Sequence, residues 1–327
     1  MVIGHRGASG YRPEHTRSAY ELAFALGADA VEPDIVATKD GVLVLRHENE
    51  VSGTTDVAEH PEFAHLRTTK VIDGRTLTGW FTEDFTWSQL ATLHARERIP
   101  AIRGDSATFG DRWGVLRLSD LLGIIDDQSE RLGRELGMVA EIKHATYFAS
   151  LGLPLDELFA AEIAAWATPT RLVVESFEET VLSLVRQRNV PARYIYLVEA
   201  SGSPADLVAR FGRKALSYSA HLTSAGLARL ANSVDGVSVD KSLLLRKDSD
   251  GNAIGTTDLV QRAHAVGLQV FTWTLRAENK FLSPNFRRGS TPRDYGDWLG
   301  EFLLILGSGV DGVFADQPDL VLDALAH

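Results

Sequence analysis

The opening turn of the chain joins a proton-transfer group to an anion-binding group. His5 and Arg6 follow the short apolar run Val2-Ile3 and lie among glycines at positions 4, 7 and 10. An imidazole titrates near neutral pH, and a guanidinium is a permanent forked cation suited to phosphate. Glycines let the backbone turn tightly and approach a ligand. This turn is therefore a candidate for anion chemistry.

Three carboxylates are predicted to meet on neighbouring strands. Glu32 and Asp34 are two residues apart in a predicted strand, so their side chains share one face while Val31 and Ile35 point the other way. Glu141 lies on the next predicted barrel strand, two residues before Lys143. Buried carboxylates repel one another unless a cation lies between them. Three oxygen ligands without sulfur favour one divalent ion, Ca²⁺ or Mg²⁺.

The same residues allow a purely structural interpretation. Buried ion pairs, for example Glu141 with Lys143, would also place charged side chains on these strands. Pro33 is unusual in a central strand, because it lacks a backbone donor. The coincidence of carboxylates on adjacent strands beside His5 and Arg6 favours the metal site.

A second histidine is predicted to reach this cluster through a hairpin. If Asp40-Gly41 forms a two-residue loop, Lys39 pairs with Val42, and His47 lies opposite Asp34. An error of one residue in the loop length would still leave His47 beside Glu32 and Asp34. Two imidazoles flanking a metal-bound phosphate are a natural general acid and general base. His144, directly after Lys143, could also touch the site.

Alternating strand and helix patterns predict an α/β fold, a TIM (β/α)8 barrel. The predicted strands are Val2–Gly4, Ala30–Ile35, Met138–Ile142, Arg171–Glu175, Tyr194–Val198, Gly236–Val239, Gln269–Thr274 and Gly312–Phe314. The predicted helices are Ser18–Leu26, Leu118–Asp126, Leu155–Ala167, Glu179–Arg188, Pro204–Arg210, Ser224–Ala231, Thr256–Ala265 and Asp319–Leu325. We expect Val42–Leu45 to fold back on the second strand as a hairpin arm.

Residues 1–327 are predicted to form a single catalytic domain. An insertion after the second strand, residues 48–114, has mixed polar composition and weak periodicity, and is expected near the mouth of the barrel. A smaller insertion is expected at 280–297.

Composition limits the partners. The formal net charge of −11 argues against nucleic acid or an anionic membrane held by bulk electrostatics. The absence of cysteine excludes disulfides and thiolate metal sites. The chain starts on its first strand without a secretion signal, so we expect a cytoplasmic protein, or a periplasmic or secreted one if the chain is a processed form. The oligomeric state is left open.

Many separate motifs resemble the glycerophosphodiester phosphodiesterase family, in the order found there. They are His5-Arg6-Gly7, Pro13-Glu14-His15-Thr16, Glu32-Pro33-Asp34, Thr38-Lys39-Asp40-Gly41, His47-Glu48, Glu141-Ile142-Lys143, Ser176-Phe177, Trp273-Thr274 and Gly309-Val310-Asp311-Gly312. The resemblance spans Ile3 to Pro318 except the two insertions, and it implies a TIM barrel with an insertion after its second strand.

The resemblance also implies roles for individual residues. Metal ligands would be Glu32, Asp34 and Glu141, and the acid/base pair would be His5 and His47. Substrate contacts would be Arg6 and Lys143 at the phosphate and Trp273 at the glycerol pocket, with Glu14 orienting the cluster. Without the resemblance, Trp273 would be assigned to the core.

Three positions depart from the common family pattern. His15 replaces the usual Asn and is similar to the bacterial periplasmic-type branch, which is often calcium-dependent. Glu48 stands where Asp is frequent, and Glu175 stands where Gln is frequent. An additional carboxylate at Glu175 would contact the metal or a substrate amine.

The resemblance implies hydrolysis of a glycerophosphodiester to sn-glycerol 3-phosphate and an alcohol. The glycerol 2-hydroxyl would attack phosphorus with one histidine as base and the other as acid, and water would open the cyclic product; direct attack by water is the alternative. Other substrates within this chemistry are a lysophospholipid or a teichoic-acid-like polymer. A barrel that only binds ligands is the alternative from another class.

Overall fold

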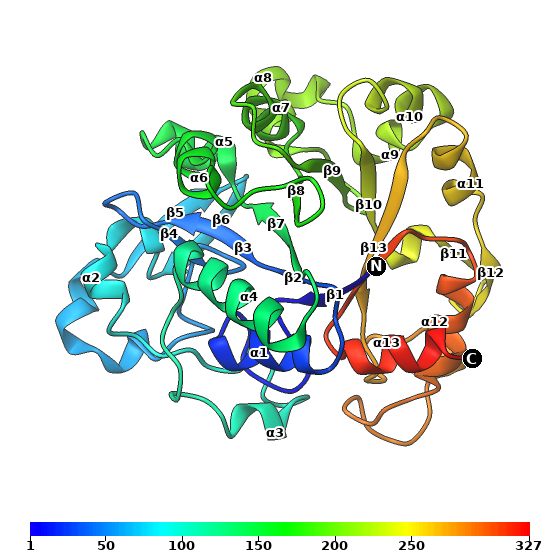
Figure 1. Cartoon of the computed structure of the whole chain (residues 1–327), viewed down its shortest axis with the longest axis horizontal. Helices are drawn as coiled ribbons and strands as arrows, with labels where there is room; N and C mark the ends of the chain where they lie inside the picture. The colour runs from blue at the N-terminus through cyan, green and yellow to red at the C-terminus, as the bar shows by residue number, and fades with distance from the viewer.

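The computed structural model describes residues 1–327, and its centre is a closed barrel of parallel strands (Figure 1). Strand β2 pairs with β1 on one side and with β7 on the other, which closes the sheet. The second position is one strand interrupted at Pro33, so the barrel has eight positions, as predicted. In order these are β1 (Val2–His5), β2 (Ala30–Glu32) with β3 (Asp34–Ala37), β7 (Gly137–Ile142), β8 (Leu172–Ser176), β9 (Arg193–Val198), β10 (Gly236–Asp240), β13 (Gln269–Leu275) and β14 (Gly312–Ala315).

The two faces of the strands bury different sets of side chains. The barrel interior is filled by seven buried residues, namely Ile3, Ala30, Val139, Val173, Ile195, Phe271 and Phe314. The alternate residues, including Val31 and Ile35 as predicted, pack outward with the helices in a core of 66 buried residues. Because side chains alternate along a strand, Glu32 and Glu141 fall on the interior face.

Helices surround the barrel (Figure 1). They are α1 (Arg17–Ala25), α4 (Leu118–Leu132), α5 (Ala145–Ser150), α6 (Leu155–Ile163), α7 (Glu179–Gln187), α8 (Ala205–Phe211), α9 (Tyr218–His221), α10 (Ser224–Leu230), α11 (Leu259–His264), α12 (Trp298–Leu306) and α13 (Pro318–Leu325). All eight predicted helices are present, with shifted ends. α4 runs to Leu132 because Gly133 supplies the left-handed end, with φ of 63°. None of these helices has the length and apolarity that crossing a membrane would require.

Several elements were not predicted, among them the short helices α5 and α9. A hairpin of β11 (Leu245–Lys247) and β12 (Ala253–Thr256) follows η5 (Lys241–Leu243), so α11 begins at Leu259 rather than at Thr256. Helix α12 directly follows the segment predicted as the smaller insertion, which contains η6 (Pro284–Phe286).

The hairpin after β3 is present, but its predicted loop length is wrong. Strand β4 (Leu43–Leu45) is antiparallel to β3, with Val36 opposite Val44. The N–H of Thr38 donates to the carbonyl of Val42 over 3.0 Å, so the loop has three residues and ends at Gly41 with φ of 77°. A glycine in the left-handed region is typical of three-residue hairpin loops. Arg46 therefore lies opposite Asp34, and His47 lies one residue further on.

The chain between β4 and α4 includes the predicted insertion at 48–114 and contains mostly short elements. These are η1 (Val57–Glu59), η2 (Pro61–Leu66), the hairpin of β5 (Thr68–Ile72) and β6 (Arg75–Gly79), η3 (Thr82–Asp84), α2 (Trp87–Leu90) and α3 (Gly104–Ala107). The fully buried Arg46 ties this region to the barrel, because its guanidinium donates to the carbonyls of Thr54 and Glu14. The single domain with insertions at 48–114 and 280–297 stays a prediction.

Candidate active site

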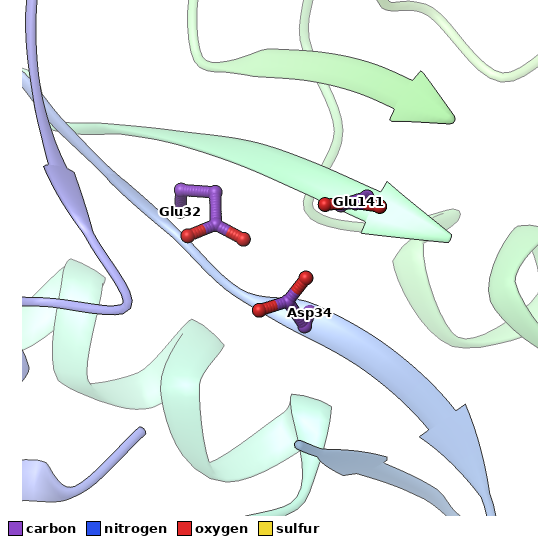
Figure 2. Close-up of side chains that lie close together, drawn as sticks. All are labelled: Glu32, Asp34 and Glu141. Carbon is purple, nitrogen blue, oxygen red and sulfur yellow. The ribbon is translucent and has the colours of Figure 1, made fainter. Parts of the chain in front are cut away.

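The structure brings the three predicted carboxylates together (Figure 2). One side-chain oxygen from each of Glu32, Asp34 and Glu141 lies within 4.8 Å of the others, and all three residues are buried. Asp34 and Glu141 are register partners on β3 and β7. Pro33 keeps its place in the sheet as an acceptor, since its carbonyl receives the N–H of Glu141 over 2.9 Å.

Several buried oxygens in this cluster accept no hydrogen bond. They are Glu32 Oε1, Asp34 Oδ1 and Glu175 Oε2. Glu175 lies on β8 as the register partner of Glu141 and is 1% exposed. A buried polar atom without a partner costs free energy, whereas carboxylate oxygens are the preferred ligands of Ca²⁺ and Mg²⁺. The donor set of this cluster therefore fits one divalent ion.

The pKa values of the carboxylates also indicate a cation site. Burial and the neighbouring Asp34 raise the pKa of Glu32 well above its usual range. Burial, with Asp34 nearby, raises the pKa of Glu141 to about 8. Burial and the charge of Glu141 likewise raise the pKa of Glu175. These groups resist ionising together because the cations around them do not offset the full negative charge.

Asp34 differs from the other carboxylates because cations surround it. Burial opposes its ionisation, but the charge of Lys143, the hydrogen bond with His15 and the charge of Arg6 hold its pKa well below the usual range. The Nζ atom of Lys143 is 3.5 Å from Asp34 Oδ1 and 2.9 Å from Glu141 Oε1. The ion pair between Glu141 and Lys143 that the sequence left as an alternative is thus present beside the oxygens without partners.

A buried carboxylate contacts His5 on the side of its ring that carries Nδ1. Its Nδ1 lies 2.6 Å from Asp316 Oδ1, and the side chains are 11% and 1% exposed. Burial, together with the charge of Arg6, lowers the pKa of His5 to about 4. Its Nε2 has no hydrogen bond within the protein, and the residue lines the cavity described below.

His47 also contacts a carboxylate through Nδ1, but its side chain is more exposed to solvent than that of His5. Its Nδ1 lies 2.5 Å from Glu48 Oε1, and its side chain is 29% exposed. Burial and the charges of Arg6 and Lys143 lower the pKa of His47 to about 3. Two neutral imidazoles thus line one cavity, each held through Nδ1 with Nε2 available.

Arg6 links the opening turn to the carboxylates. Its backbone N–H donates to Glu32 Oε2 over 2.8 Å, and its Nε lies 3.3 Å from Asp34 Oδ2. Its Nη1 donates to Glu14 Oε2 over 3.0 Å. Glu14 in turn receives two hydrogen bonds from Arg98, which also contacts Glu48 over 2.7 Å. Glu14 therefore holds the guanidinium of Arg6 against the cluster.

A cavity of about 1130 Å³ opens from the cluster. His5, His47, Glu141 and Lys143 line it at one end, and Trp273 and Phe177 form part of its wall with ring centroids 5.7 Å apart. The tip of the β5–β6 hairpin lines the cavity from Ile72 to Arg75, and its Asp73 lies 2.6 Å from His144 Nδ1. His144 itself lines the cavity and contacts the hairpin at Asp73.

Four residues around the site were missed or left without a role. His15 is fully buried, and its two nitrogens contact Asp34 and the hydroxyl of Tyr20. Asp316 directly follows β14, and an acidic residue at the end of a barrel strand is a signal that could have found it. Arg98 and Arg103 lie far along the chain from their partners, and nothing local in the sequence marks them.

Comparisons with known proteins support the fold and point to one family. A glycerophosphodiester phosphodiesterase of Arabidopsis thaliana is 29% identical over 96% of this chain and 82% of its own length. One from Haemophilus influenzae is 25% identical, covering 99% and 89%. A solved Oleispira antarctica phosphodiesterase, in complex with the product sn-glycerol-3-phosphate, has the same fold with a TM-score of 0.66 and 19% identity, covering 100% of this chain and 97% of its own. The model of the glycerophosphoryl diester phosphodiesterase family matches residues 5–320, and the chain therefore belongs to that family.

Proposed function

We propose that this protein hydrolyses glycerophosphodiesters to sn-glycerol 3-phosphate and an alcohol, using one divalent metal ion and two histidines. The observation that carries the proposal is the group of buried carboxylate oxygens without partners beside the cavity that His5 and His47 line. The names of the relatives and the product bound to the Oleispira antarctica structure support the substrate class.

Glu32, Asp34 and Glu141 would hold the ion, and Glu175 lies close enough in register to assist. Bound there, Ca²⁺ or Mg²⁺ would neutralise phosphate charge and acidify a bound hydroxyl. His15 and Arg6, which both contact Asp34 Oδ2, would fix the direction of that carboxylate.

The two histidines would move the protons. One imidazole accepts the proton of the attacking hydroxyl at its free Nε2, and the other, once protonated, donates to the oxygen of the leaving alcohol. Attack by the glycerol 2-hydroxyl followed by opening of the cyclic phosphate, or direct attack by water, would each use this pair. Arg6 and Lys143 stabilise the phosphate oxygens as charge develops. Trp273 would form the wall of the part of the cavity that binds the glycerol group of the substrate.

The size of the cavity favours a second class of substrate. About 1130 Å³ exceeds the roughly 300–1,000 Å³ of ordinary small-molecule sites. A bulky leaving group, as in a lysophospholipid or a glycerol phosphate polymer, would therefore also fit.

The direct test is release of glycerol 3-phosphate from glycerophosphocholine, with and without EDTA. We expect release that EDTA abolishes and that added Ca²⁺ or Mg²⁺ restores. Lysophosphatidylcholine and a poly(glycerol phosphate) in parallel reactions test the bulky substrates. If none of the three substrates is cleaved at any metal concentration, the barrel is a binding module and the proposal is wrong.

A further inference from the structure

Asp316 receives three donors at the back of His5. His5 Nδ1 lies 2.6 Å from its Oδ1, while Arg103 Nη2 and Arg276 Nε donate to its Oδ2 over 2.5 and 2.6 Å. The side chain is 1% exposed, so water does not compete for these contacts. Each donor comes from a different part of the chain.

A carboxylate between two guanidiniums stays ionised. Burial opposes ionisation of Asp316, but Arg276 and Arg103 hold its pKa well below the usual range. An ionised carboxylate only accepts hydrogen bonds, so the proton of neutral His5 must lie on Nδ1. The lone pair on Nε2 is then the one available to the cavity.

Arg103 connects this carboxylate to the region between β4 and α4. It is the residue before α3, and its Nε donates to Glu278 Oε1 over 2.6 Å. Its Nη1 donates to the carbonyl of Ser9 over 3.0 Å. One buried guanidinium therefore joins the opening turn, the loop after β13 and the end of β14.

The second histidine lacks such a support. Glu48, which contacts His47, is 34% exposed and receives one arginine, Arg98. The two histidines therefore differ in how firmly their rings are held. His5 is fixed by a buried network, and His47 by a contact partly open to solvent.

We infer that Asp316 is a positioning residue that fixes the tautomer and ring direction of His5, and that Arg103 makes this positioning depend on the 48–114 segment. The inference rests on the proposed function, because it assumes that His5 Nε2 exchanges a proton with substrate or leaving group. It adds a role for a residue of the 48–114 segment that is separate from shaping the cavity.

The first test is Asp316→Asn in the full-length, metal-loaded enzyme. An amide can donate to Nδ1 and so reverse the tautomer, and kcat should fall about 10²- to 10⁴-fold while KM and metal affinity change within a few-fold. Side-chain nitrogen NMR, with His5 assigned by loss of its signals in His5→Gln, should show Nδ1–H in the wild type and Nε2–H in the variant. A wild-type His5 protonated on Nε2, or a variant with nearly full kcat, would overturn the inference.

The second test uses Arg103→Met, with Arg96→Met as the matched control. Arg96 also lies between β4 and α4 and pairs with Asp111 and Glu59, but it has no contact with the His5 network. We expect kcat to fall roughly 10- to 100-fold in Arg103→Met, the usual effect of losing an outer hydrogen-bond partner, and to stay near wild type in Arg96→Met. Equal kcat in the two variants would overturn the coupling, even if Asp316→Asn does not fold.

These results are separable from failure of the proposed function. If the wild type cleaves no glycerophosphodiester, the proposed function fails, but the tautomer of His5 can still be read by NMR. If the wild type is active and its His5 carries the proton on Nε2, only the present inference fails.

Discussion

Glu141 contacts the ammonium group of Lys143 and is the register partner of Asp34. Its negative charge therefore acts directly on the proposed metal site. We expect Glu141→Gln to lose tight divalent binding and activity, because the amide keeps the shape but removes an anionic ligand. The fold should persist, since the residue packs on a barrel strand without carrying a core contact. Calorimetry with Ca²⁺ and Mg²⁺, together with a thermal melt, measures both effects.

Glu162→Gln is the matched control for that change. Glu162 is a half-buried glutamate on α6 that accepts the backbone N–H of Ser119, away from the cavity. Its substitution should leave metal affinity and activity unaltered. Unchanged affinity in Glu141→Gln itself would contradict the ligand assignment.

His47 tests chemistry apart from binding. We expect His47→Ala to lower kcat by about 10²- to 10⁴-fold, the span for a lost general acid or base, with metal and substrate affinity within a few-fold. One limb of the pH–rate profile should disappear with the titrating group. His94→Ala, at an exposed histidine paired with Asp56, is the control and should keep the full profile. Collapse of metal affinity in His47→Ala would instead identify a ligand.

At the scale of residues, periodicity was enough to predict which side chains meet. The alternation of strand side chains placed Glu32, Asp34 and Glu141 on one face, and strand adjacency brought them together. The register of His47 was off by one because loop length is not fixed by Asp40-Gly41 alone. Arg103 was not predictable, because its partner Asp316 is 213 positions away and ion pairs carry no periodic signal.

The β5–β6 hairpin is the element that we expect to select the leaving alcohol. Its tip lines the cavity, and Asp73 ties it to His144 just after β7. Replacing residues 69–78 with a short Gly-Ser linker should change the relative kcat/KM for choline, ethanolamine and glycerol diesters. This trimming spares Arg98 and Arg103, which support Glu14 and Asp316 and which a deletion of residues 53–108 would remove.

A second variant, Asp73→Asn, tests whether the position of the hairpin affects substrate choice when the hairpin itself is kept. It keeps the hairpin but weakens the contact with His144, so it should shift the same substrate ratios less than the trimmed variant does. Equal loss of kcat/KM on all three diesters in the trimmed enzyme would mark the hairpin as structural.

Elements with a periodic pattern were predictable, and short or atypical ones were not. Each barrel strand is a short, mostly apolar segment with at least one β-branched residue, and most helices have one apolar face. Their positions were therefore confirmed within a few residues. Helix α12 is apolar on nearly all sides, which hides its period, although the Asp297 side chain accepts the N–H of Gly300 at its start. The β11 and β12 strands have three and four residues, which are too few for an alternating pattern to be recognised.

For the molecule as a whole, the acidic cluster makes stability depend on metal and pH together. In the metal-free protein Glu141 has a pKa near 8, and those of Glu32 and Glu175 are also raised. In the unfolded chain these carboxyls titrate near 4.5, so between about pH 4.5 and 8 these three groups bind more protons in the folded state than in the unfolded state. The contribution of these carboxyls to stability therefore falls as the pH rises through that window. His5 and His47, whose pKa values are lowered, offset it below about pH 6.5, so the fall should be clearest between about pH 6.5 and 8.

A bound divalent ion stabilises the ionised carboxylates and so removes the cost of ionising them in the folded state. Because these groups are partly protonated without metal, binding of the ion must release protons. We expect the gain in Tm from excess Ca²⁺ or Mg²⁺ over EDTA to be small at pH 5 and to grow steadily toward pH 9. Thermal melts at several pH values measure this gain, and calorimetry in buffers of different ionisation enthalpy counts the protons released near pH 7. Glu141→Gln should flatten the pH dependence, because one of the groups that must lose a proton is gone. A metal-dependent gain in Tm that is the same at every pH would mean that the ion binds elsewhere than this cluster.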